Sequence, residues 1–130
     1  MLVRSTRSDV SLELTACGGE YVDVSITRHD LTARHKVTVY TDPDGIARFF
    51  RSMAYEWRGW SGSKTWESLE GELRLSASRD SVGHVFVAVG LMTAQGAPDP
   101  WRVEAELTIE AGMLEQVATD AEALFSQREV

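Results

Sequence analysis

The sequence predicts an α+β domain with two layers, in which two helices cover one face of an antiparallel sheet of about six strands. The main observation is an internal repeat. Residues 10–57 and residues 69–125 each contain three segments of alternating apolar and polar residues, followed by a segment with helical spacing. The length of 130 residues is typical of one domain. We therefore expect a single domain, 1–130, built from a strand–strand–strand–helix unit used twice, with residues 58–68 as the link.

The strands are expected where apolar residues recur at every second position, which leaves one face buried and the other exposed. These segments are residues 10–16, 21–27 and 31–39 in the first copy, and 69–77, 85–91 and 101–109 in the second. In the third segments, His35 and Ala105 occupy equivalent inward positions. Leu2-Val3 is expected to add a short edge strand, and Gly18-Gly19 to form a turn.

The helices are predicted from apolar stripes at helical spacing. Asp42-Pro43-Asp44 supplies an N-cap candidate and a proline at the first position of the first helix. Its stripe contains Ile46, Phe49, Phe50, Met53 and Trp57, and Gly59 is expected to end it. The second stripe contains Leu114, Val117, Ala118, Ala121, Leu124 and Phe125.

The link, 58–68, is rich in glycine yet carries Trp60 and Trp66. Loops seldom contain tryptophan, so two interpretations stay open. The rings either fold back over the seam between the copies, or form a surface that binds a partner.

The charge of the chain is uneven. The net charge is −7; residues 1–65 hold nine Lys/Arg and eight Asp/Glu, whereas residues 66–130 hold four and twelve. A surface of this sign disfavours nucleic acid and anionic lipid and favours a basic protein partner. Ordinary solubility of an acidic domain is the alternative explanation.

The sequence also predicts the compartment. Cys17 is the single cysteine, so it has no partner for an internal disulfide. Residues 1–9 lack the apolar segment of a secretory signal, and no apolar run approaches the ~18 residues that span a bilayer. We therefore expect a cytoplasmic protein without membrane contact.

Motifs for catalysis are missing. The sequence has no Gly-x-Ser-x-Gly, no phosphate-binding loop and no Gly-x-Gly-x-x-Gly. His29, His35 and His84 show no metal-ligand spacing. We expect no catalytic residue, no metal and no cofactor.

Four carboxylates are the remaining candidates. Glu70 and Glu72 are expected to share the outward face of one strand, as are Glu104 and Glu106. Arg74 and Arg102 lie on the same predicted faces and could neutralise part of this charge. The cluster is interpreted either as a solvated charged face or as an acidic patch that docks a basic partner.

The chain also resembles known families. Trp57-Arg58-Gly59-Trp60, Ser68-Leu69-Glu70-Gly71, Gly83-His84-Val85 and His29-Asp30-Leu31-Thr32-Ala33, with Gly62, Lys64, Trp66, Leu73 and Leu75, are similar to a small actinobacterial family without assigned function. In the order of its elements and in Leu69-Glu70-Gly71-x-Leu73-x-Leu75, the chain more distantly resembles the WapI-like immunity proteins, which neutralise toxins of contact-dependent competition. Glu110-Ala111 stands where that group has an aspartate–glutamine pair.

These observations predict a non-enzymatic protein-binding domain, immunity-like by resemblance. Its candidate contact residues are Trp60, Trp66, Glu70, Glu72, Glu104 and Glu106. The rival hypothesis is a small-ligand-binding or weakly enzymatic domain, with a pocket between helices and sheet near His35, His84 and Trp57. A third is a homodimer formed through a sheet face or edge.

Overall fold

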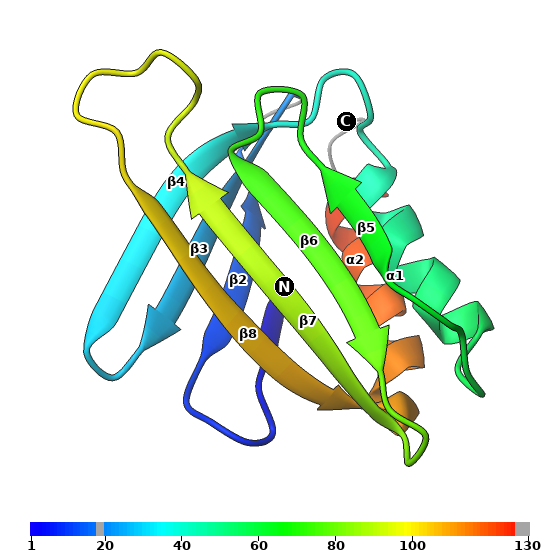
Figure 1. Cartoon of the computed structure of the whole chain (residues 1–130). Helices are drawn as coiled ribbons and strands as arrows, with labels where there is room; N and C mark the ends of the chain where they lie inside the picture. Colours follow the sequence, from blue (N-terminus) through cyan, green and yellow to red (C-terminus); the bar gives the residue numbers. More distant parts are fainter. Residues whose placement is uncertain (18–19, 127–130) are drawn as a thin grey trace.

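The protein is described by a computed structural model that covers residues 1–17 and 20–126 (Figure 1). The expected turn at Gly18-Gly19 lies outside the described residues. The fold is α+β, but it has two antiparallel sheets of four strands each in place of one sheet of about six. The first sheet contains, in spatial order, β1 (Leu2–Arg4), β2 (Ser11–Ala16), β3 (Tyr21–Arg28) and β4 (Leu31–Thr38). The second contains β5 (Lys64–Glu67), β6 (Leu73–Arg79), β7 (His84–Met92) and β8 (Arg102–Glu110).

The two helices follow the two sheets. α1 (Gly45–Tyr55) comes after β4, and α2 (Leu114–Ser126) comes after β8 and a short 3₁₀ turn, η1 (Ala111–Met113). The helices lie side by side behind the second sheet in Figure 1, with α1 next to β5 and α2 in contact with β2. Arg51 joins them, because its guanidinium contacts Glu115 at 2.8 Å and Glu122 at 2.6 Å.

Most of the predicted apolar stripes face the core. Phe50 of α1 and Phe125 of α2 are almost fully buried. Trp57 is the exception: α1 ends at Tyr55, and the Trp57 side chain is 52% exposed. The helix also begins at Gly45 rather than at Pro43. The early end is the physical reason that Trp57 leaves the stripe, since helical spacing no longer applies beyond Tyr55.

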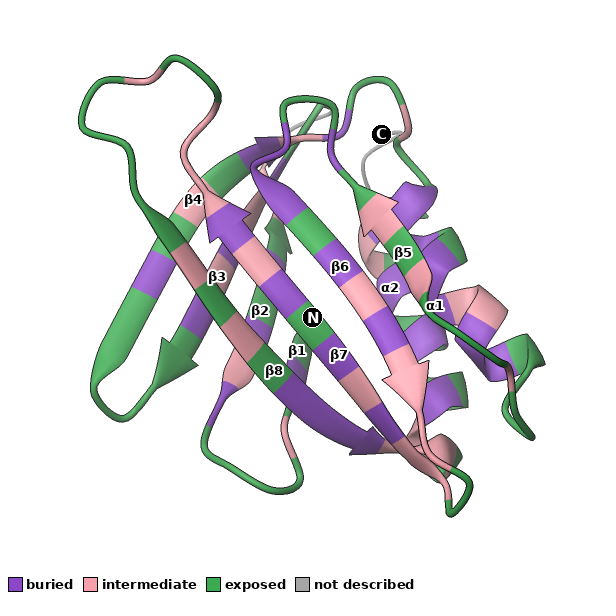
Figure 2. Ribbon diagram, in the orientation of Figure 1, coloured by how far each residue is buried: buried purple, intermediate pink, exposed green. Residues whose placement is uncertain are grey.

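The core lies between the inner faces of the sheets and the helices. Buried and less buried residues alternate along β6 and β7, as Figure 2 shows. The two sheets approach each other where β4 contacts β7, and the residues after β1 bind β8. The Thr6 backbone N–H donates to the carbonyl of Thr108 at 2.7 Å, and the Thr108 N–H donates to the hydroxyl of Ser5 at 3.0 Å.

A strand inside the predicted link explains why there are two sheets. Lys64–Glu67 form β5, which pairs with β6 in the register Trp66 to Leu75. The second copy thereby completes a sheet of its own, and the first copy completes another with β1, the edge strand predicted at Leu2-Val3. Alternation of apolar residues identifies strands but does not determine which edges pair, so the expected single sheet differs from the two sheets observed.

Candidate functional site

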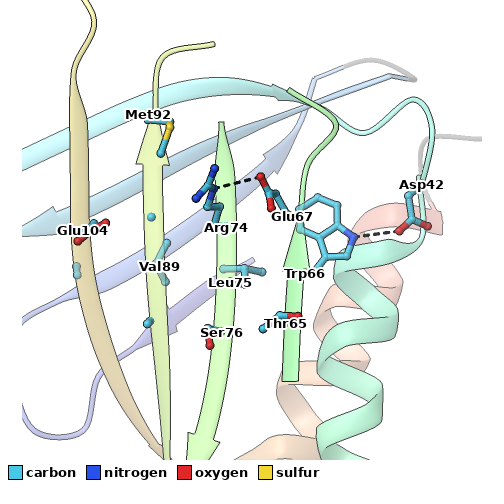
Figure 3. Close-up of a pocket in the computed structure, with 13 residues that line it drawn as sticks. Asp42, Thr65, Trp66, Glu67, Arg74, Leu75, Ser76, Val89, Met92 and Glu104 are labelled. Atoms are coloured by element: carbon cyan, nitrogen blue, oxygen red, sulfur yellow. Dashed lines mark hydrogen bonds and ion pairs between the residues drawn. The ribbon is translucent and has the colours of Figure 1, made fainter. Parts of the chain in front are cut away.

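A groove of about 640 Å³ crosses the outer face of the second sheet (Figure 3). We call it the sheet groove. Its lining comes from β5, β6, β7 and β8, together with one residue of the segment before α1. The lining residues are Asp42, Thr65, Trp66, Glu67, Arg74, Leu75, Ser76, Ala88, Val89, Gly90, Met92, Glu104 and Ala105.

The floor of the groove is open because three outward residues, Ser76, Ala88 and Gly90, are small. Ser76 of β6 faces Ala88 of β7 in the strand register, and Arg74 faces Gly90. A Cβ placed on Gly90 would meet only the Cβ of Arg74, at an ordinary contact distance of 3.8 Å. Neighbouring atoms therefore do not force a glycine at position 90. Its lack of a side chain leaves accessible space in the floor of the groove.

Charged side chains stand on both sides of this floor. On the β5–β6 side, Arg74 Nε lies 3.2 Å from Glu67 Oε1. On β8, Arg102 Nε lies 3.7 Å from Glu104 Oε1, and Glu106 makes no ion pair with any residue in the described ranges. Ala88 pairs with Glu106 across the sheet and Gly90 with Glu104, so these carboxylates flank the open floor. The arrangement suits a cationic group that enters between them.

The corner of the groove near α1 is occupied by Asp42 and Trp66. The indole N–H of Trp66 donates to Oδ2 of Asp42 at 3.0 Å, and Arg48 donates to both oxygens of that carboxylate. The hydrogen bond from Arg48 lowers the pKa of Asp42, with partial desolvation acting against it and Trp66 adding to it. The ionised form of Asp42 is therefore favoured, and its hydrogen bonds with Trp66 and Arg48 fix this corner of the groove.

The two tryptophans of the link are half-buried and not fully exposed. Trp66 packs beside the start of α1, and Trp60 packs against the core with Lys64 and Arg79 over its ring. Both rings therefore pack against the core of the fold. Trp66 also lines the sheet groove, whereas Trp60 does not.

Glu70 and Glu72 do not share a strand face, so this expectation was wrong. β6 begins only at Leu73, and Glu70 is exposed in the turn before it. Glu72 is buried, with only 4% of its surface exposed, and accepts a hydrogen bond from the Ser68 hydroxyl at 2.8 Å. The turn at Gly71, whose φ is +76°, interrupts the alternation that the sequence suggested. Glu104 and Glu106 are exposed on β8, as expected.

The three residues of the rival pocket lie apart. His35 makes an edge-on contact with Trp101, with ring centroids 5.7 Å apart. His84 lies 2.7 Å from Asp80 across the β6–β7 hairpin, and Trp57 is exposed after α1. Trp57 does line a hollow of about 700 Å³ at the helices, but the charged groups there, Arg51 with Glu115 and Glu122, are already paired.

The sequence analysis missed the groove itself. Its floor residues, Ser76, Ala88 and Gly90, are not among the candidates that the sequence suggested. The signal was present as two neighbouring strands with small residues at successive outward positions, Ser76 and Ser78 on β6, and Ala88 and Gly90 on β7.

Fold and site together define a small α+β domain with an open, acid-flanked groove on one sheet. The chain belongs to a family of unknown function, DUF6228, whose model matches residues 4–128. Searches of the curated proteins and of the solved structures gave no significant match. Among the described residues, no helix has the length and apolar character to cross a membrane, and no group of three His, Cys, Asp or Glu side chains is placed to hold a metal ion.

Proposed function

We propose that this protein is a non-enzymatic binding domain whose sheet groove holds a basic segment of a protein partner. The observation that carries the proposal is the small-residue floor at Ala88 and Gly90, flanked by the carboxylates of Glu104 and Glu106. A lysine or arginine side chain that lies across this floor would place its apolar stem on Ala88 and Gly90 and its charge beside β8.

The charge of the molecule supports a basic partner. Residues 66–130 carry twelve acidic and four basic residues, and this half of the chain contains β6, β7, β8 and α2. Complementary charge raises the rate of association and disfavours partners of the same sign. The exposed Glu106 contributes fully to this field, because no described residue neutralises it in an ion pair.

The narrower proposal is that the partner is a toxin. It rests on the resemblance in element order to the WapI-like immunity proteins, a class that acts by binding and not by catalysis. The groove supports it only in general terms, because an open face of this size suits part of a protein surface.

The experiment compares three baits immobilised from purified protein. These are the wild type, E104K/E106K, and a control, E13K/D120K, which changes the net charge equally but on the first sheet and on α2. Lysate of the native cell is passed over each bait at low and at high salt, and retained proteins are identified by mass spectrometry.

The proposal predicts that one basic protein is retained by the wild type and by the control, is lost from E104K/E106K, and is weakened by high salt. A toxin domain in that protein would support the immunity assignment. Equal retention by E104K/E106K, or retention of nothing by any bait, would contradict the proposal.

A small cationic ligand is the second candidate, because about 640 Å³ lies in the usual range for ligand sites, roughly 300–1,000 Å³. It predicts that the low-molecular-mass fraction of the lysate raises the melting temperature of the wild type but not of G90V, in which the floor is filled. A homodimer predicts instead a doubled mass in light scattering without any added partner.

A further inference from the structure

A pocket of about 390 Å³ lies at the opposite end of β6 from Arg74 and shares no lining residue with the sheet groove. It is lined by Arg58, Gly59, Trp60, Arg79, Asp80 and Ser81. Two arginines therefore face one pocket in a chain whose net charge is −7. The lining of this pocket is therefore locally rich in positive charge.

These two arginines differ from most others in the described ranges, because neither makes an ion pair. The paired ones are Arg28, Arg34, Arg48, Arg51, Arg74 and Arg102. Arg58 stacks on Trp57, with its guanidinium carbon 5.2 Å from the ring centroid. Carboxylates are abundant in an acidic protein. Two arginines that share a pocket and have no carboxylate partner therefore indicate that a bound anion supplies the counter-charge.

Arg79 is held in position without being neutralised. Its Nη1 donates to the carbonyl of Trp57 at 2.5 Å and its Nε to the carbonyl of Asp80 at 3.3 Å. The Nη2 group has no partner among the residues the structure describes. A half-buried guanidinium that is fixed by neutral carbonyls and keeps free donors is preorganised for an oxyanion, because little conformational freedom remains to be lost on binding.

The indole ring of Trp60, which lines the pocket, also contacts cationic side chains. The guanidinium carbon of Arg79 lies 5.4 Å from the centroid of Trp60, and Lys64 Nζ lies 5.3 Å from it. The indole N–H of Trp60 is buried without a hydrogen-bond acceptor in the described part of the chain. The ring thus fixes two cations, although Lys64 also pairs with Glu56 at 2.9 Å.

Asp80 is the one carboxylate that lines the pocket, and it is already engaged. It accepts hydrogen bonds from the backbone N–H groups of Val82 and His84, and its Oδ2 lies 2.7 Å from His84 Nδ1. Partial desolvation opposes its charge, but these hydrogen bonds prevail and bring its pKa to about 2. Its oxygens are engaged within the hairpin, and neither Arg58 nor Arg79 forms an ion pair with them.

We propose that Arg58, stacked on Trp57, and Arg79, over the ring of Trp60, form a binding site for an oxyanion, either a carboxylate or a phosphate group. The hydroxyl of Ser81 lines the same pocket and adds a donor. The site is independent of the proposed binding of a basic partner, because the two surfaces have no residue in common.

The test is an NMR titration of the ¹⁵N-labelled full chain with inorganic phosphate, and separately with acetate, at constant ionic strength. We expect saturable shifts at the amides of Gly59, Trp60 and Ser81 for at least one anion. The tighter anion identifies the chemical source, phosphate or carboxylate.

The variants decide whether the arginines are responsible. R58Q removes an exposed side chain, and R58Q/R79Q removes both charges; loss of charged hydrogen bonds of this kind weakens binding by about tenfold or more. R34Q, which removes an arginine paired with Asp23 on the first sheet, should bind as the wild type does.

Because Arg79 also holds the carbonyl of Trp57, the R58Q result stands alone if R58Q/R79Q does not fold. Shifts that never saturate with either anion, or equal affinity in folded R58Q and wild type, would overturn the proposal.

Discussion

The indole N–H of Trp66 donates a hydrogen bond of 3.0 Å to Oδ2 of Asp42, and this bond ties the edge strand of the second sheet to the segment that leads into α1. Arg48, on the first turn of α1, holds the same carboxylate at 2.8 Å. The pair therefore connects the first copy of the repeat to β5 of the link, at one corner of the sheet groove, as Figure 3 shows. We expect this corner to matter for stability as well as for the shape of the groove.

Replacement of Trp66 by phenylalanine should destabilise the fold. The variant loses the hydrogen bond to Asp42 and part of a half-buried ring, which together are worth about 1–3 kcal/mol. Urea unfolding followed by circular dichroism gives the free energy of unfolding. W57F is the matched control, because Trp57 is 52% exposed and its loss should change stability by no more than about 0.5 kcal/mol. Equal stability of W66F and wild type would refute the role of this bond.

Replacement of Gly45 by alanine should also destabilise the fold, although alanine normally favours a helix over glycine. A Cβ at this position would collide with the indole nitrogen of Trp66 and with the carboxylate of Asp42. Overpacking of this kind costs about 1–3 kcal/mol. In the double variant G45A/W66F, the two losses in unfolding free energy should not add, because one of the two colliding groups, the indole nitrogen, is gone while the Asp42 carboxylate remains. Strict additivity of the two effects would show that the collision with Trp66 does not occur.

The Arg51 contacts predict a pH-dependent link between the helices. Hydrogen bonds from Arg51 lower the pKa values of Glu115 and Glu122, and partial desolvation opposes both shifts. A lowered carboxyl pKa stabilises the fold above the ordinary value of 4.5, and this contribution is lost as the pH falls through the lowered pKa. R51M should therefore be slightly less stable than the wild type at pH 7, because solvent screens this pair, and its stability should fall less between pH 5 and pH 3 than that of the wild type.

Chemical denaturation at several pH values measures this difference. R34M is the control, since it removes a surface pair with Asp23 inside one sheet and leaves the helix pair intact. Parallel pH profiles for R51M and wild type would count against the link.

Filling the groove floor should leave the fold intact. In G90V the new Cβ meets only the Cβ of Arg74, at an ordinary contact distance of 3.8 Å, and valine is a better strand residue than glycine by about 0.5–1 kcal/mol. Thermal unfolding should therefore show an unchanged or raised melting temperature. A clear fall in the melting temperature would mean that position 90 is crowded, and that the floor is not open.

Much of the secondary structure could be predicted from alternation alone. The strands around Val24, Val37, Val87 and Ile109 lie where period two placed them, because each has one buried and one wetter face. α2 also matches its stripe, from Leu114 to Phe125. These elements are set by local burial, which a sequence pattern records directly.

The pairing of edges could not be predicted in the same way. β5 is only four residues long, Lys64–Glu67, and its half-buried Lys64 and Trp66 do not read as a strand in a glycine-rich link. Once β5 takes the edge of β6, the second sheet is complete. The burial of Glu72 could not be predicted either. It accompanies a hydrogen bond from Ser68 in the turn before β6, and the alternation of apolar and polar residues carries no information about such a contact.

The candidate site was predicted only in part. Glu104 and Glu106 are exposed where expected, but the groove they flank depends on what is absent at Gly90. A hollow arises from the register of neighbouring strands, and register was not known before the structure.

The most direct test of the central claim is the amount of the salt-sensitive basic partner that G90V retains from lysate, compared with the wild type at the same low salt. If the sheet groove holds the partner, G90V should retain at least about tenfold less, the equivalent of roughly 1.4 kcal/mol, while its melting temperature stays at or above the wild-type value. Equal retention by folded G90V would show that the partner does not enter the groove, and would contradict the account.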